Sequence, residues 1–326
     1  MKNDQIEMII PTTKEDYLRT ERDLSSFFEF LPISTIIFIG PESLEECVVK
    51  TKQNYPRPDC IQYLNENDLI ANRDFLSAMK TRLLKEGYSM GHNSRPGWYY
   101  QQFLKMAFSE KSSENYYMTW DADTIPLREI EMFDRAGKPF FDIKPEYMPG
   151  YFLTIKKLFR IDKQIDQSFI SEHMIFNTNY MMELISEIEN MDLPGDRFYE
   201  KIIYAIDINN MKWGFSEFET FGNWMVNRYP DVYALRNWSS MRLGGYFLDS
   251  SKLGKKDIQW LSEDFDAITF EGHTEVVPDL SEAFFNEDYR NRFSAAQFYT
   301  MLLESGIFGE YKDGMRKAEN GGYYPV

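Results

Sequence analysis

The 326-residue sequence predicts an α/β protein, a Rossmann-like α/β/α sandwich whose central sheet is mostly parallel, with a C-terminal helical extension. Two observations carry this prediction. In the first half of the chain, short β-branched or aromatic runs alternate with longer helical patterns, as in strands joined by crossover helices. Each run is followed by turn or helix-capping residues, which end a strand and allow a helix to begin.

The first half of the chain carries four candidate strands and the helices between them. Thr12 and Glu15 have the spacing of a capping box, so we expect a helix to begin just after the first strand. A helix over 97–108 precedes the fourth strand, and we expect its N-terminus to point toward the sheet edge. The strands are expected at 7–10, 34–39, 60–64 and 116–120, and a longer helix at 68–90.

The second half of the chain is less regular. We expect a helix at 180–190 and strands at 140–143, 174–177 and 267–270. Beyond residue 275 the pattern is typical of helices packed on a main domain. We therefore divide the chain into a main α/β domain over 1–275 and a helical extension with a tail over 276–326. The tail, from Asp313 onward, is rich in turn formers and is expected to fray.

Composition excludes several classes of protein. The chain has 36 Lys and Arg against 52 Asp and Glu, a net charge of −16, which argues against binding nucleic acid through its phosphates. Its two cysteines, Cys47 and Cys60, form neither a disulfide framework nor a CxxC metal pattern, which indicates a reducing compartment. No apolar run approaches the roughly 18 residues that a membrane span needs, and the charged N-terminus is not a secretory signal. We expect a cytoplasmic protein whose basic and aromatic cluster at 156–160 is the candidate for peripheral contact with the inner membrane face.

Two Asp-x-Asp pairs occur, at Asp121/Asp123 and Asp264/Asp266. A chain with 23 Asp gives about 1.5 such pairs by chance, so the spacing alone indicates nothing. Their contexts differ, because Asp121 directly follows the predicted strand 116–120 whereas the second pair lies in a polar stretch. Ligands of open α/β sheets bind beyond the carboxyl ends of strands. The first pair is therefore the candidate site.

Asp121 and Asp123 offer hard oxygen ligands to Mn²⁺ or Mg²⁺. Residues two apart on an extended chain face the same way, so both carboxylates can address one cation directly or through water. A divalent cation there would offset the charge on a leaving diphosphate, which is the Lewis-acid role. The alternative structural interpretation is a solvated turn after a core strand.

A second enzyme class also matches this segment. Residues 121–125 approximate the pattern of haloacid-dehalogenase phosphatases, in which Asp121 would be the nucleophile. That pattern usually opens its domain on the first strand, whereas three candidate strands precede Asp121 here. The later pair Gly195-Asp196 follows Leu193-Pro194, which is loop chemistry rather than the end of an apolar strand.

Taken in order, five segments of the chain resemble the GT-A class of glycosyltransferases, and more closely a bacterial family of surface-polysaccharide glycosyltransferases. The resemblance spans about residues 6–225 and is vague beyond them. The Asp-x-Asp is unspecific alone, and the ordered set is more specific. The segments are 9–12 (Ile-Ile-Pro-Thr), 97–105, 120–124 (Trp-Asp-Ala-Asp-Thr), 171–176 and 215–219.

The resemblance implies a GT-A-like domain over 1–275 that binds a nucleotide-sugar donor, most readily a UDP-sugar, with Asp121 in the donor site. Near the start of the helix at 97–108, Trp98 and Tyr99 either pack in the core or stack on a base or sugar. A helix N-terminus and a lysine both stabilise phosphate charge. Expected donor-pocket residues from three further segments are Pro11, Thr12, Thr13, Asn65 or Glu66, Gln101, Gln102 and Lys105.

An inverting transferase needs a carboxylate that removes the proton of the acceptor hydroxyl. Glu217 and Glu219 lie where the GT-A class tends to place this base. Ser216 and Glu219 also have capping-box spacing, which explains Glu219 without a catalytic role and leaves Glu217 as the first candidate.

The chain has three histidines. His92 lies in a loop and is expected at the surface. We expect His173 to touch acceptor or donor, and His273 to be an extra metal ligand as in many GT-A enzymes. For these two the alternative is a structural histidine satisfied by hydrogen bonds.

The sequence thus predicts a metal-dependent transferase of hexosyl type that moves a sugar from a nucleotide diphosphate to a glycan or lipid-linked acceptor. The two alternatives are the phosphatase and a non-catalytic glycan-binding protein, since 16% of the residues are aromatic and could serve as stacking platforms.

Overall fold

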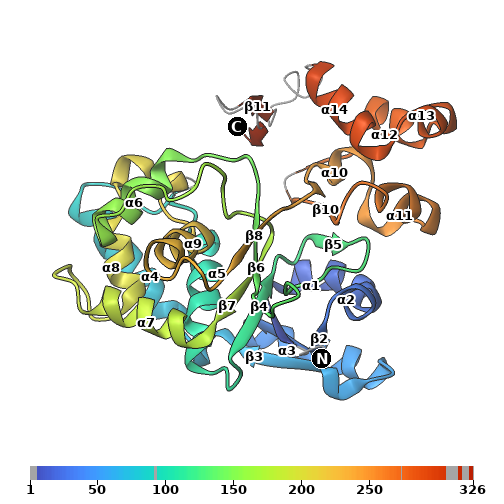
Figure 1. The fold of residues 1–326 in the computed structure, drawn as a ribbon. Coiled ribbons are helices and arrows are strands. Elements are labelled where there is room, and N and C mark those ends of the chain that lie inside the picture. The colour runs from blue at the N-terminus through green and yellow to red at the C-terminus, as the bar shows by residue number, and fades with distance from the viewer. Residues whose placement is uncertain (1–5, 92–93, 273, 306–314, 318–322, 326) are drawn as a thin grey trace.

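The computed structural model describes residues 6–91, 94–272, 274–305, 315–317 and 323–325. At its centre lies a five-stranded sheet in the order β3-β2-β1-β4-β7 (Figure 1). Strands β1 to β4 run parallel, and β7 is antiparallel to β4. The predicted α/β class with a mostly parallel sheet is confirmed. The strands are β1 Ile6–Pro11, β2 Ile33–Gly40, β3 Ile61–Asn65, β4 Tyr116–Trp120 and β7 His173–Asn177.

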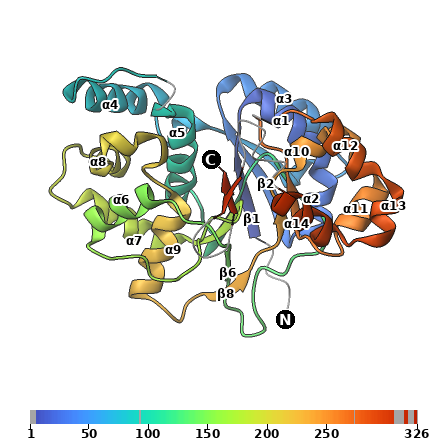
Figure 2. The same ribbon diagram turned by 90° about the horizontal axis from the view of Figure 1, so that it is seen from above.

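Helices cover both faces of this sheet (Figure 2). Alternate residues of β1 point to different cores: Met8 and Ile10 pack with one set of helices, and Ile9 packs with the other. The first set is α1 Lys14–Thr20, α2 Leu24–Phe30 and α3 Glu42–Asn54. The second set is α4 Asn72–Lys85, α5 Pro96–Ala107, α6 Pro149–Phe159, α7 Thr178–Glu189, α8 Phe198–Ala205 and α9 Glu217–Arg228.

The C-terminal part builds a third apolar core. Phe284 of α12 and Phe298 of α14 pack with Phe247 of α10, and this core reaches back to Ile125 and Met241, on the other side of residue 275. The short strands are β5 Thr124–Pro126, β6 Phe140–Ile143, β8 Ala234–Asn237, β9 Ser240–Met241, β10 Ala267–Thr269, β11 Met315–Lys317 and β12 Tyr323–Pro325. The remaining helices are α10 Gly244–Phe247, α11 Lys255–Leu261, α12 Pro278–Phe285, α13 Glu287–Arg292 and α14 Ala295–Ser305.

Short pairings and turns complete the fold. Strand β10 pairs with β5 and β9, β6 pairs with β8, and β11 pairs with β12. The tail was expected to fray, but in its described part residues 315–317 pair antiparallel with 323–325. The 3₁₀ turns are Glu21–Asp23, Pro58–Cys60, Glu66–Asp68, Phe108–Glu110, Ile208–Trp213 and Ser250–Lys252. Within the described ranges, no helix has the length and apolar character to cross a membrane.

Two local predictions need correction. Thr13, not Thr12, caps α1, because its hydroxyl accepts the amide of Asp16 at 3.2 Å. Thr12 directly follows β1, and its amide donates to Ile39 O of β2 at 2.8 Å. The helix expected at 68–90 is shorter, because residues 66–68 form a 3₁₀ turn capped by the side chain of Asn65.

Candidate active site

One cavity of about 990 Å³ opens at the carboxyl ends of β1 and β4. It brings together most of the predicted site residues, which come from segments up to about 200 positions apart in the sequence. Asn65, Glu219 and His173 do not line it, and His273 lies outside the described residues. The predicted residues that line it are Pro11, Thr12, Thr13, Gln101, Gln102, Lys105, Asp121, Asp123 and Glu217, together with the alternative Glu66.

The turn that carries the Asp pair is fixed by distant parts of the chain. Strand β4 ends at Trp120, whose buried indole donates to Thr124 O at 2.7 Å and closes the turn. Further hydrogen bonds to the backbone of residues 121–123 hold the turn, so both carboxylates lie at the cavity. These bonds are Asp121 N to Glu172 O at 2.9 Å, Thr20 Oγ1 to Ala122 O at 2.7 Å and Phe270 N to Asp123 O at 2.8 Å.

The charges around Asp123 suit a divalent cation. Burial, with the neighbouring carboxylates of Asp121 and Glu271, raises the pKa of Asp123 from 3.8 to about 7. Such crowding of carboxylates is relieved by a bound cation. In the described part of the chain, no group of three or more His, Cys, Asp or Glu side chains is arranged to hold a metal. The chain therefore supplies two carboxylates, a set that suits Mg²⁺ or Mn²⁺ when substrate phosphates and water complete the coordination.

Lys105 of α5 links the Asp pair to the opposite wall of the cavity. Its Nζ donates to Asp121 Oδ1 at 2.7 Å and to Glu217 Oε1 at 2.8 Å, and the residue is only 3% exposed. Burial by itself lowers the pKa of a lysine, but the two carboxylates outweigh it and raise the pKa of Lys105 above its ordinary value. Lys105 is therefore a fixed cation next to the candidate metal site.

Glu217 begins α9 and lines the cavity. Its backbone amide donates to Gln102 Oε1 at 3.1 Å, so a second predicted donor-site residue positions the helix start. Burial raises the pKa of Glu217, and Lys105 opposes the rise. Of the two predicted bases, Glu217 is the one whose position suits the role.

Glu219 faces the protein interior instead. Its carboxylate accepts from Ser168 Oγ at 2.5 Å and from Asn223 Nδ2 at 2.9 Å. Its amide donates to Ser216 Oγ at 3.3 Å, so Ser216 is the N-cap as predicted, while the Glu219 side chain does not return to the cap. Burial raises the pKa of Glu219 from 4.5 to about 7.

Glu219→Gln is expected to stabilise the protein above neutral pH. A carboxyl whose pKa rises on folding contributes its full stability below its unfolded pKa of 4.5, and loses it as pH rises through about 7. The wild type should therefore lose about 3 kcal/mol relative to the variant between pH 4.5 and pH 8. Urea denaturation of both proteins across this range measures the difference. A constant difference at all pH values would show that Glu219 titrates normally.

His173 is a structural residue of the core. Its ring lies 4.8 Å from the ring of Trp120 and 4.4 Å from that of Trp238, and the residue is 2% exposed. Both ring nitrogens are engaged, Nε2 with Asp142 Oδ2 at 2.9 Å and Nδ1 with Ser171 O at 2.8 Å. The structure therefore does not bring His173 to donor or acceptor. It supports the strand end that carries the Asp pair.

Asn65 also has a local role. Its Oδ1 accepts the amide of Asn67 at 2.9 Å and caps a 3₁₀ turn. The next residue, Glu66, lines the cavity in its place. Of the two alternatives for a contact with the base, the structure favours Glu66.

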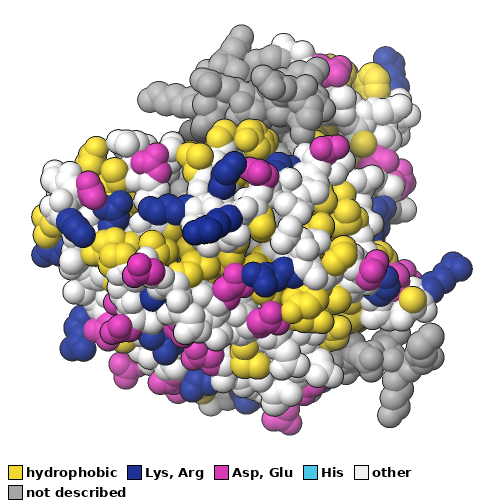
Figure 3. Space-filling model, turned by 60° about the vertical axis from the view of Figure 1, so that its left-hand side comes forward, with side chains coloured by type: hydrophobic (Ala, Val, Ile, Leu, Met, Phe, Trp, Pro, Cys, Tyr) yellow, Lys and Arg dark blue, Asp and Glu magenta, His cyan; other side chains and the backbone are white. Residues whose placement is uncertain are grey.

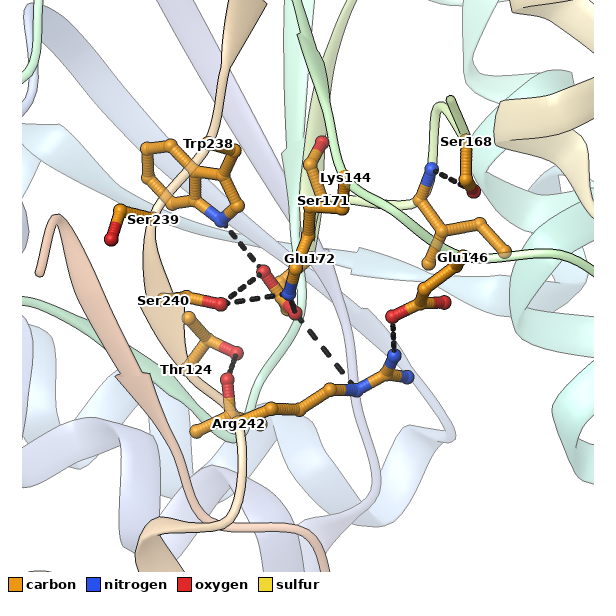
Figure 4. Close-up of polar contacts among 12 residues, drawn as sticks. Thr124, Lys144, Glu146, Ser168, Ser171, Glu172, Trp238, Ser239, Ser240 and Arg242 are labelled. Carbon is orange, nitrogen blue, oxygen red and sulfur yellow. Dashed lines mark hydrogen bonds and ion pairs between the residues drawn. The ribbon is translucent and has the colours of Figure 1, made fainter. Parts of the chain in front are cut away.

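Glu172 and Arg242 are among the cavity residues that the sequence did not predict (Figure 4). The Glu172 carboxylate is buried against Lys144 Nζ at 2.6 Å and Trp238 Nε1 at 2.7 Å. Despite burial, which raises the pKa of a carboxyl, Lys144 and Arg242 hold the pKa of Glu172 below its ordinary value. Arg242 also contacts Glu146 and, at 3.1 Å, Glu271.

The backbone of Glu172 is strained, with a φ of 62° in the left-handed region. Such a conformation is unfavourable for a residue with a side chain, and in folded proteins it concentrates at functional sites. Here it turns the carbonyl of Glu172 toward the amide of Asp121 and the carboxylate toward Lys144. No sequence pattern marks either feature.

Fold and site together define an α/β protein with a ligand cavity at the carboxyl edge of a parallel sheet, where open α/β sheets bind ligands. The chain belongs to the family of unknown function DUF6492, which matches residues 3–300. That family's description assigns no activity, so the expected likeness to surface-polysaccharide transferases stays a prediction. No curated protein sequence matches the chain.

Several solved structures of glycosyltransferases are distantly similar. Mouse xyloside xylosyltransferase 1 in its apo form covers 84% of this chain and 99% of its own, at 11% identity and a TM-score of 0.42. The galactosyltransferase LgtC, in complex with donor and acceptor sugar analogues, covers 88% of this chain and 100% of its own. The sequence identity is 11% and the TM-score is 0.39. The bifunctional glycosyltransferase WbbM covers 83% of this chain and 46% of its own, at 10% identity and a TM-score of 0.42. Because these scores are low, we base the function on the site.

Proposed function

We propose that the protein is a metal-dependent glycosyltransferase that moves a sugar from a nucleotide diphosphate to a glycan or glycolipid acceptor. One observation carries the proposal: Lys105 joins Asp121, at the end of a central strand, to Glu217 on the facing wall of the same cavity. A volume of about 990 Å³ is at the upper end of small-molecule sites, which suits two substrates at once.

The donor would lie along the sheet edge. Pro11, Thr12 and Thr13 line the part of the cavity next to β1 and would contact the nucleoside, a uridine in the first instance. Asp121 and Asp123 would hold Mn²⁺ or Mg²⁺, which supplies Lewis-acid stabilisation of the leaving diphosphate. Lys105 keeps its proton and adds fixed positive charge on the same side.

Glu217 would take the proton of the acceptor hydroxyl in an inverting transfer. Burial raises its pKa and so makes it a stronger proton acceptor than a solvated carboxylate. The ion pair with Lys105 keeps Glu217 ionised before the reaction. The attack and the departure of the diphosphate then occur on opposite faces of the sugar, which inverts its configuration.

A lipid-linked acceptor would be reached by peripheral contact of a cytoplasmic protein with the inner membrane face. Figure 3 shows basic and hydrophobic side chains together on the side of the molecule where α6 lies. On α6, Lys156 and Lys157 are exposed and Leu153 is 51% exposed, whereas Leu158 is buried. Lysines and Leu153, rather than the whole cluster at 156–160, would therefore contact lipid.

A thermal-shift screen of UDP-, GDP-, CMP- and dTDP-sugars with and without Mn²⁺ tests the function. We expect one nucleotide sugar to stabilise the protein only when Mn²⁺ is present. At a 100-fold excess over Kd the stabilisation is about 2.7 kcal/mol. Asp123→Asn, which removes one metal ligand, should lose the metal-linked part of this shift.

Two other results would contradict the proposal. A phospho-aspartyl enzyme at Asp121, trapped as its fluoroberyllate analogue, would identify the phosphatase instead. Binding of glycans that needs neither metal nor nucleotide, with no response to any donor, would identify a non-catalytic glycan-binding protein.

A further inference from the structure

A cluster of aromatic rings and cations lies at the other end of α5 from Lys105. The guanidinium of Arg95, the residue before α5, lies 4.4 Å from the ring centroid of Trp98 and 4.3 Å from that of Trp213. Tyr151 stacks on Trp98 at 6.3 Å with an interplanar angle of 26°. All four residues line the cavity. They form one wall in which a cation is framed by indole rings.

Arg95 is held in place by its backbone as well. Its φ of 41° lies in the left-handed region, which is unfavourable for arginine. Its Nη1 donates to Lys212 O at 3.4 Å, a long bond that leaves most of the guanidinium donors available. The strained backbone and the two indoles thus fix the direction of a side chain that is normally flexible.

The positive charge of the cluster is not balanced by an ion pair within the described residues. No carboxylate of a described residue forms an ion pair with Arg95 or with the exposed Lys212. Burial lowers the pKa of Arg95 and outweighs the opposing effect of Tyr151, Tyr99 and Glu271. The other two cations of the cavity are paired: Lys105 with two carboxylates and Arg242 with three. The net charge of the chain is −16, so unpaired cations in its cavity are notable. Arg95 and Lys212 are therefore the residues of the cavity wall that suit an anionic ligand.

The cluster and the candidate metal site lie at different ends of α5. Ten residues of α5 separate Arg95 from Lys105, which is about 15 Å at 1.5 Å per helical residue. Lys105 contacts Asp121, so the candidate metal site lies at the far end of the helix. A diphosphate held at Asp121 and Asp123 would therefore lie next to the Lys105 end of the helix, which leaves the Arg95 end for the acceptor.

We propose that Arg95 and Lys212 bind an anionic group of the acceptor, so that the acceptor is an acidic glycan carrying a carboxylate or a phosphate. This inference rests on the proposed function. Trp98 and Trp213 would stack on sugar rings, while the planar guanidinium pairs with the oxygens of the acidic group in two parallel hydrogen bonds. Neutral glycans would use the rings but leave both cations unpaired.

Calorimetric titration of the full-length protein, without donor or metal, tests the proposal with matched pairs of probes. The pairs are tetragalacturonate with galactotetraose, and mannobiose 6-phosphate with mannobiose. We expect at least one acidic probe to bind about tenfold or more tightly than its neutral partner at low salt. The pair that shows the preference identifies the acidic group as carboxylate or phosphate.

Variants separate this role from a structural one. Arg95→Gln and Lys212→Gln should each reduce the preference for the acidic probe, and the double variant should abolish it while neutral binding is kept. Lys212 is exposed, so its variant folds even if Arg95 is needed for stability. Lys50→Gln, an exposed lysine of α3 on the other face of the sheet, is the matched control.

Equal binding of acidic and neutral probes, binding of none of the four, or a preference unchanged in the double variant would overturn the proposal. Metal-dependent donor stabilisation is measured on the same proteins. If the donor binds and the acidic preference is absent, only this inference fails. If the wild type binds no donor, the proposed function fails.

Discussion

Asp123→Asn is expected to lower the turnover of the proposed transferase about 1000-fold without destabilising the protein. The substitution removes one charged ligand of the divalent cation. Lewis-acid stabilisation of the leaving diphosphate contributes several kcal/mol. Each factor of ten in rate corresponds to about 1.36 kcal/mol. Asparagine keeps the backbone carbonyl that Phe270 N binds at 2.8 Å. It also removes repulsion from Asp121 and Glu271, so stability above pH 7 should stay equal or rise.

The second Asp-x-Asp pair supplies the matched control. Asp264 accepts the amide of Ala296 at 2.8 Å and does not line the cavity, and asparagine can make the same bond. Asp264→Asn should therefore leave turnover within about twofold, since surface changes away from a site have small effects. Initial rates are measured with the donor found in the thermal-shift screen, with thermal unfolding as the measure of stability. Turnover of Asp123→Asn within tenfold of the wild type would exclude an essential metal ligand at this position.

The sequence predicts most strands of four or more residues well because their signal is local. Strands β4 and β6 begin and end at the predicted residues, 116–120 and 140–143. After the first residue of each strand, their β-branched and aromatic side chains are buried, so composition reports the structure directly. Strand β9 has two residues, Ser240 and Met241, and pairs with β10 about 27 positions later. A strand of this length has no periodicity, and only its distant partner defines it.

The predicted site residues also fall into those that the sequence placed correctly and those that it did not. Asp121, Lys105 and Glu217 were predicted because motif order places them near one sheet edge, and the structure joins them through hydrogen bonds. Glu219 and His173 were misplaced because the direction of a side chain depends on packing, and both face the interior. Neither periodicity nor spacing reports that direction.

Glu172 and Arg242 line the cavity but were absent from the predicted site, for a different reason. The φ of 62° at Glu172 and its contact with Lys144 exist only after β7 and the segment before α6 have come together. Arg242 is 70 positions further along the chain and meets Glu172 at 3.9 Å. The segment 171–176 was singled out by resemblance, but no sequence pattern pairs Glu172 with Lys144 or Arg242, so buried charge networks of this kind require the structure.

Lys105→Met is expected to reduce the free energy of unfolding by about 3–5 kcal/mol at pH 7, the usual cost of removing one partner of a buried ion pair. The reason is that the substitution leaves a buried carboxylate without its cation. The Glu217 side chain is only 4% exposed and would lose its cation, whereas the Asp121 side chain, at 34%, is partly solvated. Urea denaturation measures the loss. Lys111→Met, at an exposed lysine shortly after the same helix, is the control and should change stability by less than about 0.5 kcal/mol.

A double variant and the pH dependence separate this charge effect from a packing defect. Lys105→Met/Glu217→Met replaces the pair by apolar residues, which is often neutral, and should recover most of the lost stability although it abolishes activity. In Lys105→Met, the pKa of Glu217 loses the opposing effect of Lys105 and rises further. A raised carboxyl pKa favours the folded state at low pH, so the deficit of the single variant should shrink as pH falls toward 5. If the deficit is the same at pH 5 and pH 8, or persists in the double variant, then lost packing of the lysine chain against Phe218 is its cause.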